Sequence, residues 1–210
     1  MFFCMPAQTD DKVWFDSKRR FAGICADVAS LKSQQQNILL LAHFPTTQSL
    51  VQQSLRAAAI EFETFSLADS SLLCSMGSRG RVLVGLVRAL QPTTAQLGFT
   101  QQDTKLQIIV AEHHPINGKD RSLVTTAERL PCKPTVCFHA SLDDPLMKHF
   151  GSDQLVTLFK SLGADEAEPI SHPFVTSAIQ NAQEKIESQV QRDVACESMD
   201  DWFKFNLKKR

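Results

Sequence analysis

The sequence predicts an α/β protein with a doubly wound, mostly parallel sheet. Three continuous apolar runs, 37–42 (NILLLA), 81–87 (RVLVGLV) and 106–111 (LQIIVA), are typical of strands that are buried on both faces. Segments with helical spacing of apolar residues separate these runs, and alternating strands and helices favour a parallel sheet. After Ala140 the pattern becomes purely helical. We therefore expect an α/β domain over residues 1–140 and a helical extension over 141–210.

The other elements of the α/β part follow from periodicity and capping residues. Asp16 is placed to accept a hydrogen bond at the start of the first helix, and Thr46 or Thr47 could do so for the second. Further strands are expected at 12–15, 60–65 and 135–140, and further helices at 70–78 and 119–130.

The helical extension begins with Ser141 as a cap, followed by two acids that suit a helix N-terminus. A short helix is expected at 153–162, and a long one starts at Pro173 and stays in register to Arg210. Its apolar stripe requires a partner in the same chain or in another one. With the proline, this stripe is the predicted partner-binding surface: Pro173, Val175, Ile179, Ala182, Ile186 and Val190.

Composition narrows the classes of function. The net charge of -1 does not suggest a nucleic-acid footprint, and no apolar run reaches the ~20 residues that span a bilayer. The six cysteines form no CxxC pair and resemble reduced core residues, so we expect a cytoplasmic protein. Cys132, Cys137 and His139 are the one candidate metal cluster, but their spacing does not suit zinc and no metal is expected.

Two polar groups could carry chemistry. Glu112, His113 and His114 end a predicted strand at the carboxyl edge of the sheet, where α/β proteins usually bind ligands. Asp143 and Asp144 could be paired catalytic carboxylates, but acids at a helix N-terminus are far commoner.

The stretches 141–154 (SLDDPLMKHFGSDQ) and 162–187 (LGADEAEPISHPFVTSAIQNAQEKIE) resemble SecA, the motor ATPase family of bacterial preprotein export. Weaker similarity covers 12–31, 37–55, 106–112 and 199–201. The resemblance implies a RecA-like domain of the helicase C-terminal type, with a P-loop NTPase fold. This would be the family's second motor domain, followed by the start of its helical scaffold.

The departures from the family pattern concern ATP chemistry. The sequence contains no GxxxxGK[ST] motif, and 85–96 (GLVRALQPTTAQ) replaces a glycine-rich family segment. The segment 122–132 (SLVTTAERLPC) replaces the arginine motif and leaves only Arg129 at an arginine position. Arg129, Glu112 and His114 are therefore candidate remnants of a nucleotide site. No catalytic residue is predicted, and ATP or ADP is expected only with a partner domain.

The resemblance implies a role in protein export. We expect a catalytically inactive accessory or regulatory module that binds SecA, the translocon or another motor half, with at most peripheral contact with the inner membrane. One alternative is half of a split ATPase that completes an ATP site in trans. The others are a helicase-like remnant that binds nucleic acid, against which the charge argues, and a new small-molecule site near His113 and His114.

Overall fold

The computed structural model describes residues 9–66, 80–90, 105–130, 132, 134–149, 165–171 and 173–207. The predicted helices at 70–78 and 153–162, and the end of the chain at 208–210, lie outside the described residues.

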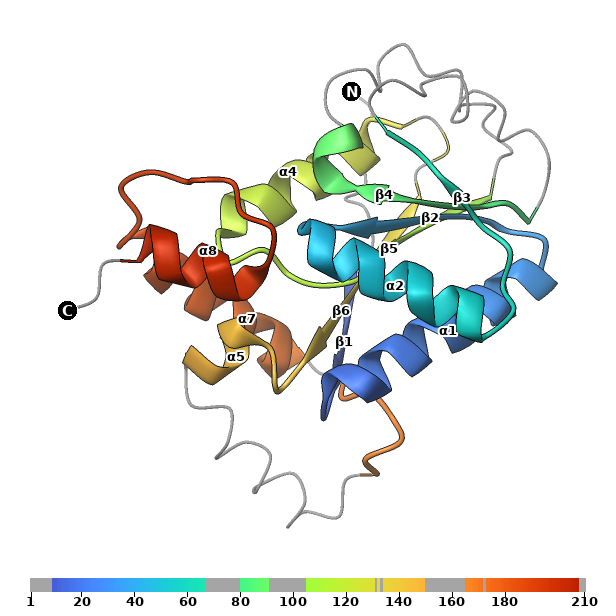
Figure 1. Ribbon diagram of the computed structural model, residues 1–210, viewed down its shortest axis with the longest axis horizontal. Helices are drawn as coiled ribbons and strands as arrows, with labels where there is room; N and C mark the ends of the chain where they lie inside the picture. The colour runs from blue at the N-terminus through green and yellow to red at the C-terminus, as the bar shows by residue number, and fades with distance from the viewer. Residues whose placement is uncertain are drawn as a thin grey trace, which may run out of the picture.

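A six-stranded sheet forms the centre of the described part of the molecule (Figure 1). Every neighbouring pair is parallel, and the order is β1-β6-β5-β2-β4-β3, which confirms the predicted doubly wound α/β class. The strands are β1 (Thr9–Trp14), β2 (Asn37–Ala42), β3 (Glu63–Thr64), β4 (Val82–Leu86), β5 (Leu106–Val110) and β6 (Thr135–Ser141).

Helices cover both faces of the sheet. Helices α1 (Ser17–Ser33) and α2 (Pro45–Ala57) pack on one face, and α4 (Asn117–Glu128) packs on the other (Figure 1). Strand β2 shows why: its residues alternate between the two apolar clusters, and all six are buried. A short 3-10 turn, η1 (Val87–Leu90), follows β4.

Two local expectations need correction. Neither Thr46 nor Thr47 caps α2: Phe44 occupies the cap position without a side-chain bond, and Pro45 starts the helix. Proline is favoured there because its missing N–H would have no partner in the first turn. The predicted strand at 60–65 is reduced to Glu63–Thr64 at the edge of the sheet. The cap at Asp16 is confirmed, since its side chain accepts a bond from Arg19 N.

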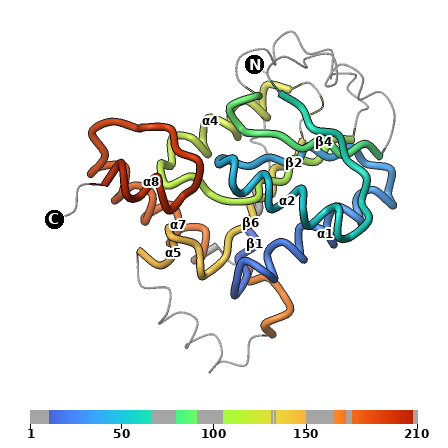
Figure 2. The backbone as a smooth tube through the Cα atoms, in the orientation of Figure 1, coloured from blue at the N-terminus to red at the C-terminus, as the bar shows by residue number. Residues whose placement is uncertain are grey.

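The helical extension folds back on the sheet. It contains α5 (Pro145–His149), α7 (Pro173–Glu187) and α8 (Met199–Asn206) (Figure 2). The expectation of one helix running from Pro173 to Arg210 is wrong, because α7 ends at Glu187 and a new helix starts after Ser198. The Ser198 side chain accepts from Asp201 N, and Asp200 and Asp201 in the first turn suit the helix dipole.

The apolar stripe of α7 is covered by this chain itself. Ile179 and Ile186 are 1% and 0% exposed, Ala182 is buried, and Val175 and Val190 are partly buried. Ile179, Ile186, Val175 and Val190 join one cluster with residues of β1, β6 and α8. The stripe therefore meets a surface of the same chain, which is one of the two possibilities that the sequence left open. The side chain of Pro173 lies outside the described set. Within the described residues, no helix is long and apolar enough to cross a membrane.

Candidate functional site

The carboxyl ends of β2 and β5 bring the candidate polar residues together. These strands pair in parallel, with Leu41 beside Val110, so the residues that follow them meet at one edge of the sheet. His43 follows β2, and Glu112, His113 and His114 follow β5. All three residues after β5 are buried.

Asp120, in the first turn of α4, is the centre of a buried polar cluster. Its Oδ2 lies 2.8 Å from His113 Nδ1 and its Oδ1 lies 2.8 Å from His43 Nε2. The His114 backbone N–H donates to Oδ1 at 3.1 Å, and Gln183 Nε2 of α7 donates to Oδ2 at 2.7 Å. Burial alone would raise the pKa of Asp120, but its bonds to His113 and His43 lower it well below the usual range. The Asp120 carboxylate therefore connects the ends of β2 and β5 with α7 of the helical extension.

Glu112 connects β5 to the start of α2. Its Oε1 accepts from the backbone N–H groups of His43 and Phe44 at 3.1 and 3.0 Å, and its Oε2 accepts from Thr47 Oγ1 at 2.6 Å. These bonds supply the acceptor that the N-terminus of α2 lacks in its own sequence. Burial outweighs the Thr47 bond and raises the Glu112 pKa. Glu112 therefore has a structural role at this helix end.

The two adjacent histidines differ in protonation. For His114, burial and the nearby His43 lower the pKa to about 3, so the ring is neutral near pH 7. Its Nδ1 accepts from Ile116 N at 3.0 Å, which places the proton on Nε2. Burial also acts to lower the His113 pKa, but the bond to Asp120 and the charges of Asp120 and Asp11 outweigh it and raise the pKa.

The returning segment after α7 covers this edge. Trp202 of α8 is 1% exposed and meets the His114 ring edge-on at 5.6 Å between ring centroids. Its Nε1 donates to Asp193 Oδ1 at 2.8 Å, and Asp193 pairs with Lys119 of α4 at 2.9 Å. Thr46 N also donates to the backbone oxygen of Glu197 at 3.0 Å. The segment after α7 therefore covers the carboxyl edge of the sheet, where α/β proteins usually bind ligands.

Two cavities flank the cluster. One, of about 120 Å³, lies between η1, α4 and α8 and is lined by His43, His114 and Trp202 among others. The other, of about 290 Å³, lies between α4 and α7 and reaches His113 and Asp120. No group of three or more potential ligands in the described part of the chain is arranged to hold a metal ion.

The structure does not bring the three predicted nucleotide-site remnants together. Glu112 and His114 lie at the carboxyl edge, next to the N-terminus of α4, whereas Arg129 is exposed at the C-cap of the same helix. A helix of 12 residues separates the two places by roughly 18 Å. In the described structure Arg129 therefore does not share one site with Glu112 and His114.

The other candidates have structural partners. Both carboxylate oxygens of Asp144 lie 2.7 Å from Arg20 Nη1, and Ser141 N donates to Oδ2 at 2.8 Å. His139 contacts Trp14 Nε1 and Asp27 instead of Cys132 or Cys137. These contacts favour the structural interpretation of both groups.

Sequence reasoning missed several members of the cluster. His43 follows the buried run at 37–42 directly, so its place at a strand end was a usable signal. Asp120 lies in the first turn of a predicted helix, where acids are common and do not stand out. Gln183 gave no signal, because only the folded-back arm brings it to Asp120.

Comparisons with known proteins agree with the resemblance to SecA. "Protein translocase subunit SecA" of Chlorobium phaeobacteroides (strain BS1) is 28% identical over 185 residues, covering 86% of this chain and 18% of that protein. The chain is similar to SecA over most of its length. The SecA of Acidithiobacillus ferrooxidans (strain ATCC 53993 / BNL-5-31) is 46% identical over 84 residues, or 40% of this chain and 9% of that protein. No family model matches the sequence.

The fold itself has a solved counterpart. The crystal structure of T4 UvsW matches 73% of this chain and 39% of its own chain, with a TM-score of 0.50 and 6% identity. At this identity the likeness shows the fold alone, which is that of a RecA-like α/β domain. The chain spans about a fifth of the length of the SecA proteins that it matches.

Proposed function

We propose that this chain is a SecA-related module of the protein-export system that binds a protein partner and does not turn over ATP. The main support is its similarity to SecA over 185 residues, while the stretches expected to contact nucleotide are replaced. A transition state for phosphoryl transfer requires a phosphate-binding loop, a metal and aimed cations. This stretch of sequence offers none of these as a set.

The arrangement of the carboxyl edge supports the loss of catalysis. The resemblance to SecA aligns segment 122–132 with the arginine motif of that family. In this chain most of the segment lies in α4 and has residues such as Val124 and Thr126 there. Arg129 remains exposed at the far end of α4. The Asp120 carboxylate contacts His113, His43 and Gln183, so it holds α7 of the helical extension against the ends of the strands.

Because the apolar stripe of α7 already packs against this chain, a protein partner would have to contact the outer surface of the helical extension. Among the described residues, two large apolar side chains of the returning segment stay exposed: Val194 at 43% and Phe205 at 72%. Phe205 points away from the cluster that buries Trp202 on the same helix. We propose that this outer side contacts SecA or a translocon component.

The test is binding of the purified chain to purified SecA, measured by surface plasmon resonance. We expect saturable binding that Phe205→Ala weakens by about tenfold, since an exposed aromatic anchor typically carries at least 1–2 kcal/mol at an interface.

Leu50→Ala is the matched control, because Leu50 is an exposed apolar residue (40%) that belongs to α2 and not to the segment after α7. Equal loss in both variants, or no binding by the unmodified chain to SecA or to translocon components, would refute the proposal. Binding only in the presence of ATP and a second motor domain would favour the split-ATPase alternative.

A further inference from the structure

Residues 193–206 are held together by their own hydrogen bonds, and we call this part of the helical extension the cap. Asn206 Oδ1 accepts from Val194 N at 2.6 Å, and Asn206 Nδ2 donates to Val194 O at 3.1 Å. Trp202 Nε1 donates to Asp193 Oδ1 at 2.8 Å. Because these bonds join the start of the segment to its end, the cap is closed on itself in the manner of an Ω-loop.

The described residues attach the cap to the carboxyl edge of the sheet through a small number of contacts. Thr46 N donates to Glu197 O at 3.0 Å. Lys119 of α4 pairs with Asp193 at 2.9 Å, but 46% of the Lys119 side chain is exposed, and exposed pairs of this kind contribute little. Trp202, which is 1% exposed, is the main apolar anchor. Most of the attachment therefore depends on one side chain.

The interface between the cap and the α/β part is incompletely packed. The cavity of about 120 Å³ lies in this interface. Ala195 and Cys196 line it from the cap, whereas Leu90 and Leu123 line it from η1 and α4. Side chains that border a cavity lack the close contacts of a packed interior. Fewer contacts are therefore lost when the cap separates from the edge of the sheet.

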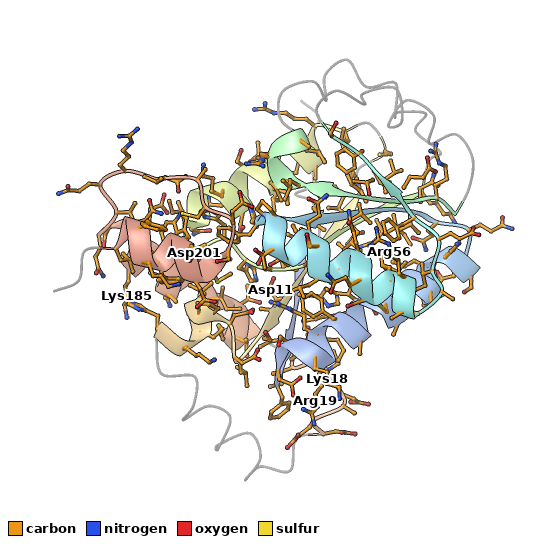
Figure 3. The ribbon with its side chains drawn as sticks, viewed as in Figure 1. Asp11, Lys18, Arg19, Arg56, Lys185 and Asp201 are labelled. Atoms are coloured by element: carbon orange, nitrogen blue, oxygen red, sulfur yellow. The ribbon has the colours of Figure 1, made fainter. Side chains whose placement is uncertain are left out.

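The connection between α7 and the cap has the properties of a hinge. Helix α7 ends at Glu187, and residues 188–192 form no helix or strand and are mostly exposed. Exposed segments with few buried apolar contacts open at a low free energy. In Figure 3, Asp201 of α8 and Lys185 of α7 lie at the same end of the molecule, away from Arg56 of α2. The cap can therefore move away from the edge while α7 stays packed.

We propose that the cap leaves the carboxyl edge as one unit, so that its docking controls access to the ends of β2 and β5. In the docked state Trp202 lies against His114, and Glu197 is bonded to the start of α2. Another molecule that binds this edge must displace the cap, which makes the cap an autoinhibitory contact within the chain. This device does not depend on the proposed export function.

Hydrogen exchange of the ¹⁵N-labelled full chain, followed by NMR at pH 7, tests whether the cap opens as a unit. Amides that open together share one protection factor. The amides of Val194, Asp201 and Trp202 are all bonded within the cap. We expect these three amides to have one common protection factor, at least about tenfold lower than that of the amides in α7.

Thr46 is the most specific probe of docking. It lies in the first turn of α2, where amides have no partner within the helix, and its N–H is bonded to Glu197 of the cap. Gln48 N in the same helix is bonded to Phe44 O instead. Exchange at Thr46 should therefore follow the cap, whereas exchange at Gln48 should follow the rest of α2.

Two lysine variants separate opening of the cap from loosening within it. Lys119→Ala removes an ion pair between α4 and the cap, so it should speed exchange of all cap amides together by roughly twofold to fivefold. Lys204→Ala is the matched control, because Lys204 pairs with Asp201 inside the cap at 3.0 Å and this pair persists when the cap opens. The control should leave the common rate unchanged.

Three results would overturn the proposal. The first is that the cap amides exchange no faster than those of α7, which would mean that the cap opens only when the whole chain unfolds. The second is that the cap amides exchange at unrelated rates. The third is that Lys119→Ala and Lys204→Ala have equal effects on the cap amides.

Discussion

At the scale of single residues, one carboxylate gives two neighbouring histidines opposite properties. Asp120 binds the His113 ring and raises its pKa, whereas it touches His114 only through the backbone N–H. The His114 ring instead lies among Phe44, His43 and Trp202, and burial there lowers its pKa to about 3. The sequence placed both histidines at the carboxyl edge, but only the contacts distinguish them.

His114 should make the protein sensitive to acid. The unfolded chain binds a proton at His114 with a pKa near 6.5, and the folded chain does not until about pH 3. Between these values the unfolded state holds more protons, so the contribution of His114 is present above pH 6.5 and is lost as the pH falls toward 3. The expected loss is on the order of several kcal/mol.

His114→Asn keeps an acceptor for Ile116 N but does not titrate. Urea unfolding between pH 7 and pH 4 should show this variant less stable than the unmodified chain at pH 7 and relatively more stable at pH 4. Parallel stability profiles for the two proteins would contradict the account.

At the scale of elements, strands and helices of the α/β part were predictable because their apolar periods are undisturbed. The run at 37–42 gave β2 with its bounds, and Asp16 and Pro173 gave helix starts. The break after Glu187 was missed, because no glycine or proline marks it. Ser198 followed by Asp200 and Asp201 was a readable start signal for α8. The length of the edge strand β3 was overestimated, because the alternation of residues in a sequence does not show that a strand at the edge pairs on one side only.

The contact of α1 with β1 gives a test of packing between elements. A Cβ on Gly23 of α1 would lie 2.0 Å from Trp14 Cζ2, and the Trp14 ring is buried and bonded to His139. Gly23→Ala should therefore destabilise the fold by about 1–3 kcal/mol despite the better helix propensity of alanine.

Gly118→Ala in α4 is the matched control. Its Cβ would meet only the Glu187 side chain at 3.1 Å and Ile116 at 3.8 Å, so alanine should be neutral or stabilise by up to about 1 kcal/mol. Chemical unfolding of both variants measures the difference. Equal stability of the two would show that α1 does not pack on Trp14 as described.

At the scale of the whole molecule, the fold class could be predicted from the sequence, but the packing of the helical extension on the sheet could not. Continuous apolar strands that alternate with helices indicated a parallel sheet, and the structure has one. The sequence left open whether the apolar stripe packs in the same chain or on another one, and in the structure one apolar cluster includes Val13 of β1, Ile179 of α7 and Trp202 of α8. The division at residue 140 stays a prediction. Packing between segments that lie far apart in the sequence leaves no periodic signal, because it depends on which surface of the folded chain the stripe contacts.

The loss of nucleotide chemistry is the central claim, and isothermal titration calorimetry of the purified chain with ATP or ADP and magnesium tests it most directly. The account predicts no detectable heat of binding at high micromolar protein, because Arg129 lies apart from Glu112 and His114 and the sequence has no phosphate-binding motif. Saturable binding of either nucleotide would contradict it and would show that the replaced segments form a working half-site.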